Sequence, residues 1–113
     1  MDRTALRNSY EDLCAAAREK VRVITPADLG AIRNQGTTII DVRDADEHQE
    51  GVLPGAVLIP RGSLEKEIQS RFEDPTHPLC LYCATGKRSL LAARTLLEMG
   101  FTDVRSLEGG FAG

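Results

Sequence analysis

Residues 79–89, which read LCLYCATGKRS, decide the fold of this chain. The first five form an apolar run, which predicts a strand buried on both faces. The run leads into Arg88–Met99, where Leu90, Ala93 and Leu97 recur on one helical face. A buried strand followed at once by an amphipathic helix is typical of a parallel sheet covered by helices.

The rest of the chain repeats this alternation of strand and helix. Apolar and β-branched runs predict further strands, and helical periodicity or capping residues predict the helices between them. The pattern predicts an α/β, three-layer fold with a mostly parallel sheet and helices on both faces. The further strands are expected over residues 21–24, 38–42, 56–59 and 103–107, and the further helices over residues 25–36 and 63–72, with a polar loop over 43–55.

Length and composition describe a single globular domain. The chain has 113 residues, 42% of them hydrophobic and 27% charged, which suffices for one core without disulfide or metal staples. We expect an N-terminal amphipathic helix over residues 1–20 and a compact domain over residues 21–113. The apolar face of that helix is predicted to contain Leu6, Tyr10, Leu13, Cys14, Ala17 and Val21.

Charge and hydropathy exclude several classes of partner. The formal net charge of -3 disfavours nucleic acid. The longest apolar run, Leu79–Ala84, is too short to span a membrane, and the first residues lack a signal-peptide pattern. Three cysteines are too few, and odd in number, for a disulfide framework, so reduced thiols and a cytoplasmic location are expected.

The three cysteines are predicted to differ in role. Cys14 lies on a helix stripe and Cys80 within a strand, so both are interpreted as buried core. A zinc site in the Cys80–Cys83 C-x-x-C pair is disfavoured because no second pair supplies the other ligands. A dithiol redox pair is disfavoured because residues three apart in a strand point to opposite faces. No metal or cofactor is expected.

Cys83 ends its strand where ligands bind in such folds, at the carboxyl edge of the sheet. Small residues after it let the chain curl, so that successive N–H groups and the positive end of the following helix point at the thiol. Together with Lys87 and Arg88, these groups favour the thiolate. Cys83 is therefore the candidate nucleophile.

Several separate motifs make the sequence resemble a single-domain rhodanese, a sulfurtransferase, from about Ile24 to Gly113. The resemblance implies a rhodanese-like fold with a five-stranded parallel sheet. It also implies that Cys83 takes a sulfane sulfur from a donor such as thiosulfate and passes it, as a persulfide, to a thiophilic acceptor. The matching stretches are residues 38–43, 46–48, 51–56, 83–89 and 107–111.

Within this resemblance, the loop residues after Cys83 are expected to bind the small anionic donor. Lys87 and Arg88 would hold the donor and balance the departing sulfite. The other expected binding residues are Ala84, Thr85, Gly86 and Ser89, together with Arg61 after the third strand. For Asp41 and Arg43 we favour a structural role that braces neighbouring loops, and for His48 a surface position.

Two other classes of function compete with the sulfurtransferase. A phosphatase or arsenate reductase prefers a C-x5-R loop, whereas only four residues separate Cys83 from Arg88 here. A non-catalytic interaction module of the same family would usually lack the cysteine that this chain retains. The acceptor is either a small molecule or a protein thiol, and the chain is expected to be a monomer.

The sequence departs from the family pattern in two places. Val52 replaces a histidine that many members carry, and the chain stops at Gly113, where relatives commonly continue with a tryptophan and a helix. We therefore expect an excised domain. The active-site loop and residues 59–62 resemble rhodanese domains that accompany activating enzymes of sulfur-carrier pathways.

Overall fold

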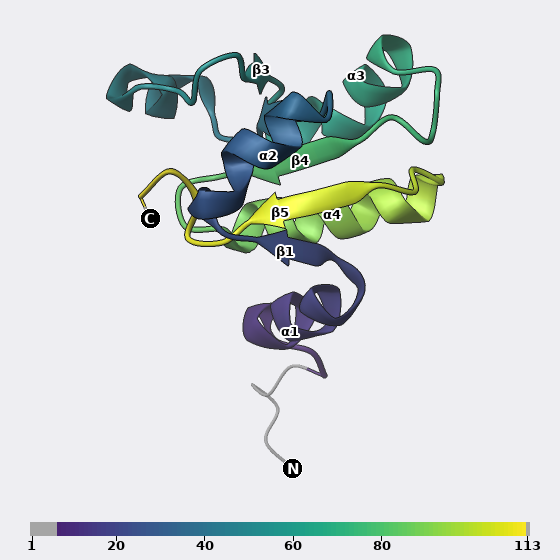
Figure 1. Ribbon diagram of the computed structural model, residues 1–113. Coiled ribbons are helices and arrows are strands. Elements are labelled where there is room, and N and C mark those ends of the chain that lie inside the picture. Colours follow the sequence, from purple (N-terminus) through teal and green to yellow (C-terminus); the bar gives the residue numbers. More distant parts are fainter. Residues whose placement is uncertain (1–6, 113) are drawn as a thin grey trace.

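A computed structural model describes residues 7–112. Its centre is a sheet of five strands, all parallel, in the order β1-β5-β4-β2-β3 (Figure 1). This arrangement confirms the predicted α/β fold and its parallel sheet. The strands are β1 (Arg22–Ile24), β2 (Thr38–Asp41), β3 (Val57–Leu58), β4 (Leu79–Tyr82) and β5 (Val104–Leu107).

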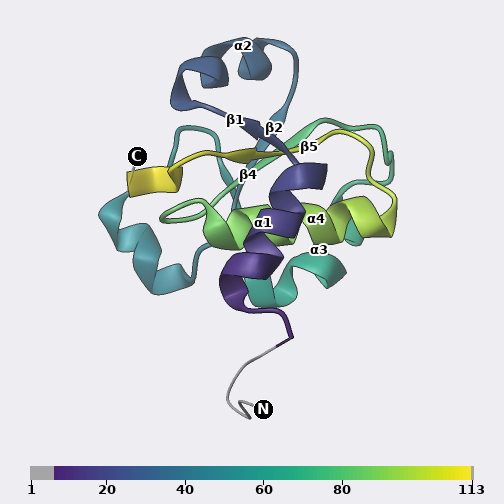
Figure 2. The same ribbon diagram turned by 90° about the horizontal axis from the view of Figure 1, so that it is seen from below.

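Helices cover both faces of the sheet, as predicted. Figure 2 shows α2 on one side and α1, α3 and α4 on the other. Within residues 7–112, no helix combines the length and the apolarity that a membrane crossing requires. The helices are α1 (Tyr10–Lys20), α2 (Leu29–Asn34), α3 (Leu64–Arg71) and α4 (Lys87–Met99).

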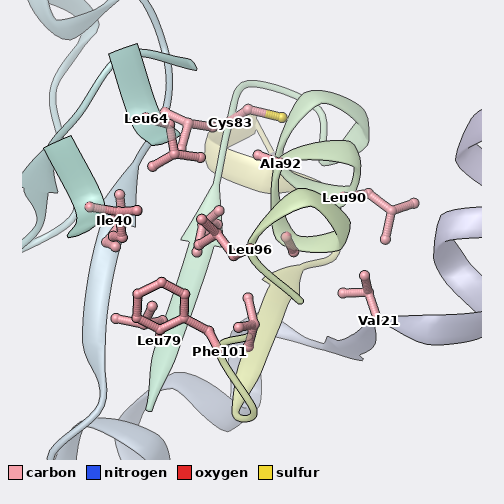
Figure 3. Packing of buried hydrophobic residues seen from close by; sticks show 14 of the residues in the cluster. Val21, Ile40, Leu64, Leu79, Cys83, Leu90, Ala92, Leu96 and Phe101 are labelled. Atoms are coloured by element: carbon pink, nitrogen blue, oxygen red, sulfur yellow. The ribbon is translucent and has the colours of Figure 1, made fainter. Parts of the chain in front are cut away.

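The core forms one cluster on each side of the sheet, because alternate residues of a strand point to opposite faces. The larger cluster lies under α1, α3 and α4, and extends from Cys83 and Leu64 at one end to Leu79 and Phe101 at the other (Figure 3). The smaller cluster lies under α2 and includes Cys80. The two cysteines of the C-x-x-C pair thus lie in different layers.

The N-terminal helix is shorter than predicted, because a capping box sets its start. The Ser9 hydroxyl accepts a hydrogen bond from the Asp12 N–H, and the Asp12 carboxylate accepts one from the Ser9 N–H. Of the predicted apolar face, Cys14, Ala17 and Val21 are buried. Leu6 falls outside the described residues, whereas Tyr10 and Leu13 are exposed.

Two further predictions were wrong in detail. The strand expected over residues 56–59 contains only the two paired residues of β3, which lies at the edge of the sheet, and Leu58 is 40% exposed. The segment expected to be a polar loop contains the 3₁₀ segment η2 (Ala45–Glu50). The carboxylate of Glu47 caps its start by accepting a hydrogen bond from the Asp44 N–H.

The turn after β5 is pressed against the start of the Cys83 loop. Gly110 has a φ of 58°, and a Cβ there would overlap the Cys83 carbonyl oxygen and the Ala84 backbone. The next residue, Phe111, donates its N–H to the same carbonyl at 2.7 Å. Only glycine fits this close approach without moving the backbone.

We therefore expect Gly110→Ala to lower the free energy of unfolding by about 3 kcal/mol, through strain and a steric clash. Urea denaturation measures the difference. The matched control is Gly30→Ala in α2, where nothing lies within 4 Å of the added methyl group and helix propensity favours alanine. Equal stability of the two variants would show that the turn is not constrained by the loop.

Candidate active site

The loop after β4 surrounds the sulfur of Cys83 with backbone donors, as the sequence predicted. Gly86 has a φ of 93°, which turns the chain back towards the strand, and α4 begins at the next residue. The N–H groups of Gly86 and Ser89 donate to Cys83 Sγ at 3.1 Å and 3.3 Å. The sulfur therefore lies at the positive end of α4, in a cradle suited to an anion.

A buried serine pair supports the far side of this cradle. The Ser89 hydroxyl lies 3.6 Å from Cys83 Sγ and 2.9 Å from the hydroxyl of Ser106 in β5. Both serines are buried. Ser106 was not among the predicted site residues, although a serine within a predicted sheet strand, where a polar group needs a partner, is a signal that could have indicated it.

Arg88 is held by a carboxylate that sequence reasoning did not assign to the site. Its guanidinium donates to both carboxylate oxygens of Glu47 at 2.9 Å. This hydrogen bonding is the main reason why the pKa of Glu47 is lowered to about 2. In this structure Arg88 joins η2 to the loop, so its charge is already balanced before any anion binds.

Lys87 is the exposed cation at the loop. It forms no salt bridge within residues 7–112, and its ammonium lies 5.9 Å from the centre of the Tyr10 ring. Thr85 is exposed beside it, whereas Cys83 has no exposed surface. A cleft of about 330 Å³ lies between α1 and this part of the loop, with Thr85, Gly86 and Lys87 in its wall.

Asp41 and Arg43 form a buried ion pair behind the loop. Their closest atoms, Arg43 Nη2 and Asp41 Oδ2, are 2.8 Å apart, and both side chains are almost fully buried. Burial raises the pKa of Asp41, but the hydrogen bonds led by Arg43 outweigh it and the pKa is lowered. Arg43 also donates to the carbonyls of Gly51 and Glu47. This geometry supports the predicted bracing role.

His48 lies closer to this pair than predicted. Its side chain is only 15% exposed, and its Nε2 is 3.6 Å from Asp41 Oδ1, so it is not the surface residue that the sequence suggested. The 3₁₀ turn of η2 brings it back towards β2, a turn that the polar composition of the segment did not reveal.

The structure does not bring Arg61 to the loop. Its guanidinium donates to the Glu65 carboxylate at 2.8 Å and to the Thr95 hydroxyl at 3.3 Å, farther along α4. Cys80 is also separate from the site, because it lies among the residues under α2, and burial there raises its pKa to about 12. Of the predicted binding residues, the structure therefore gathers residues 84–89 around Cys83 and leaves Arg61 apart.

Comparison with known families identifies the class of protein. The model of the rhodanese-like domain matches residues 25–113. The chain therefore belongs to the rhodanese-like domain family, as the sequence motifs indicated. The matched stretch begins after α1 and β1 and contains the complete Cys83 loop.

Individual relatives agree with this assignment. The chain is 38% identical over 88 residues to the thiosulfate sulfurtransferase GlpE of Pseudomonas savastanoi pv. phaseolicola. The aligned residues cover 78% of this chain and 81% of the relative. It is 31% identical over 93 residues to the adenylyltransferase and sulfurtransferase UBA4 of Meyerozyma guilliermondii, over 77% of this chain and 22% of that protein. These similarities support sulfurtransferase chemistry.

A solved structure resembles nearly the whole chain. It is a Rhodopseudomonas palustris protein of unknown function, described as a possible tyrosine phosphatase. The TM-score is 0.80 at 31% sequence identity, over 98% of this chain and 92% of the other. The likeness therefore extends to α1, which the family model does not match.

The Glu47–Arg88 pair should make the free energy of unfolding depend on pH in the acidic range. Because the pKa of Glu47 falls from 4.5 to about 2 on folding, its contribution is present above pH 4.5 and is lost as the pH falls towards about 2. We expect Glu47→Gln to cost about 1 kcal/mol near neutral pH, as a partly exposed ion pair does. The deficit should shrink through that acidic window in urea denaturation.

Glu50→Gln is the control, since Glu50 is exposed in η2 and forms no salt bridge within residues 7–112. A Glu47→Gln deficit that stays constant down to pH about 2 would contradict the assigned pairing.

Proposed function

We propose that this protein is a sulfurtransferase that carries a sulfane sulfur as a persulfide on Cys83. The observation that carries the proposal is the convergence of the Gly86 and Ser89 N–H groups on Cys83 Sγ. These donors stabilise the attacking thiolate and the persulfide anion alike, since both place negative charge within the same loop. No cofactor or metal takes part in the proposed reaction.

In the first half-reaction, the Cys83 thiolate attacks the outer sulfur of thiosulfate. A new S–S bond forms to Cys83 Sγ, and the bond inside thiosulfate breaks with its electron pair leaving on sulfite. The product is Cys83–S–S⁻, so charge is conserved and no oxidant is needed. In the second half-reaction, cyanide or a thiolate attacks the outer sulfur and the Cys83 thiolate leaves.

Lys87 is the cation best placed to attract the anionic donor, because Arg88 is already bound to Glu47. Cys83 is fully buried, so the exposed tip of the loop, with Thr85 beside Lys87, must move aside as the donor enters. The backbone N–H groups then bind the sulfur that is transferred. In this arrangement Ala84, Gly86 and Ser89 act mainly through their backbone.

The proposed setting is the reducing cytoplasm, with a small-molecule or protein thiol as acceptor and the protein acting as a monomer. We propose a place beside sulfur-carrier activation, in which the acceptor is a protein, and the similarity to UBA4, which is named as both an adenylyltransferase and a sulfurtransferase, supports this place. A non-catalytic interaction module is the alternative, and the retained Cys83 cradle argues against it.

The persulfide can be detected directly. After treatment with thiosulfate, intact-protein mass spectrometry should show the gain of one sulfur atom, and peptide mapping should place it on Cys83. We expect Cys83→Ala to lose the adduct and to lower thiocyanate formation from thiosulfate and cyanide by about a thousandfold or more.

Cys80→Ala is the control, since this thiol is buried in the α2 layer, on the other side of the sheet from the cradle, and the variant should keep the adduct. An unmodified Cys83, with no thiocyanate formed by the full chain, would overturn the sulfurtransferase and favour the interaction module.

Phosphatase activity is expected to be absent, despite the likeness to the Rhodopseudomonas palustris protein. Only four residues separate Cys83 from Arg88, and the guanidinium of Arg88 is bound to Glu47 rather than free for a phosphoryl group. Incubation with an aryl phosphate should release no phenol above the level of Cys83→Ala. Sustained turnover that Cys83→Ala abolishes would contradict this prediction.

A further inference from the structure

A second cleft lies on the opposite layer of the fold from the Cys83 cradle. It has a volume of about 390 Å³ and lies between α2 and the strands β1 and β5. Figure 2 shows α2 on this side of the sheet, away from α1 and α4. The cleft shares no residue with the loop over residues 83–89. Its lining includes two arginines, Arg22 and Arg105, together with Asp28, Gln35, Ala31 and Ile32.

The two arginines are neighbours across the sheet. Arg22 of β1 and Arg105 of β5 are paired in register, so their side chains leave adjacent strands on the same face. Like charges directly opposite each other on a sheet are unfavourable. The Asp28 carboxylate accepts hydrogen bonds from the N–H and hydroxyl of Thr25, which are the main cause that lowers its pKa, and the charge of Arg22 contributes to this shift without a salt bridge among the described residues. A negative ligand would add to the partial compensation that Asp28 and Asp103 give the two arginines.

Arg105 lines this cleft and has donors to spare. The residue is only 7% exposed. Of its N–H groups, one on Nη1 donates to the Thr37 hydroxyl at 3.2 Å, and Nη2 lies 3.3 Å from the Asp103 carboxylate. Its Nε is buried and has no hydrogen-bond partner within residues 7–112. Buried polar groups are normally satisfied, so such a donor indicates a missing acceptor.

We propose that this cleft binds a small phosphate-type oxyanion through Arg105 and Arg22. Guanidinium groups match the spacing of phosphate oxygens, and two of them on one face can hold a doubly charged anion. The side-chain amide of Gln35 at the rim adds further hydrogen-bond donors. The cleft is larger than an inorganic anion requires, so its remaining space suits the organic part of a small phosphate ester.

The proposal is separate from the sulfurtransferase proposal, because no residue of the loop over residues 83–89 lines this cleft, although Val23 lies between it and the cleft beside the loop. Its test is therefore a binding measurement that does not require sulfur transfer. Thiosulfate is left out of the buffers, since it would also react at Cys83.

The ¹⁵N-labelled full chain is titrated with sodium phosphate and, separately, with ribose 5-phosphate, while Arg Nε–H resonances are followed by NMR. Sodium chloride at matched ionic strength is the reference. We expect a saturable shift of the Arg105 Nε–H resonance with phosphate and none with chloride. If ribose 5-phosphate binds more tightly than phosphate, the rest of the cleft binds the organic part of the ester. If the two bind equally, the site binds the free anion.

Arg22→Gln should weaken binding by about tenfold or more, because it removes one of the two cations. Arg22 is exposed, so this variant leaves the core untouched. The matched control is Arg33→Gln, since Arg33 lies on α2 outside the cleft lining and donates to the Pro54 carbonyl. A shift that does not saturate, or that Arg33→Gln weakens as much as Arg22→Gln does, would overturn the proposal.

Discussion

The buried ion pair between Asp41 and Arg43 is the constraint on which the active-site side of this fold depends. Two charges without exposed surface must remain paired, and removing one partner from such a pair typically costs about 3–5 kcal/mol. The spare donors of Arg43 reach the carbonyls of Glu47 and Gly51, so the pair holds the middle of η2 and the residue that ends it next to the end of β2. With η2 in place, Glu47 can hold Arg88.

The Cys83 loop is consequently held from three directions. Glu47 binds it on the η2 side, Ser106 supports Ser89 from β5, and the turn at Gly110 presses on its first residues. A loop whose N–H groups must converge on one sulfur needs such support, because small displacements weaken every donor at once. Arg88 is part of this support, whereas Lys87 is exposed and forms no salt bridge within residues 7–112.

The two cysteines of the C-x-x-C pair lie on opposite sides of the sheet, in different surroundings. Its α4 face carries Cys83 and the donors that favour an anionic sulfur, whereas Cys80, three residues earlier, lies in the α2 layer, where burial keeps it as a neutral thiol. The α2 layer also holds the cleft with the paired arginines Arg22 and Arg105. The Cys83 cradle therefore lies at the carboxyl edge of the sheet, and the cleft lined by Arg22 and Arg105 lies on its α2 face.

Local periodicity and contiguous motifs predict the alternation of strands and helices, the parallel sheet, the loop at Cys83 and the family. The folded chain is needed to see which carboxylate meets Arg88, which hydroxyl meets Ser89, and that Arg61 donates to Thr95. Those partners are 41, 17 and 34 residues apart in the chain, so no local pattern links them. They depend on how the strands are ordered, which sets the neighbours that each side chain finds.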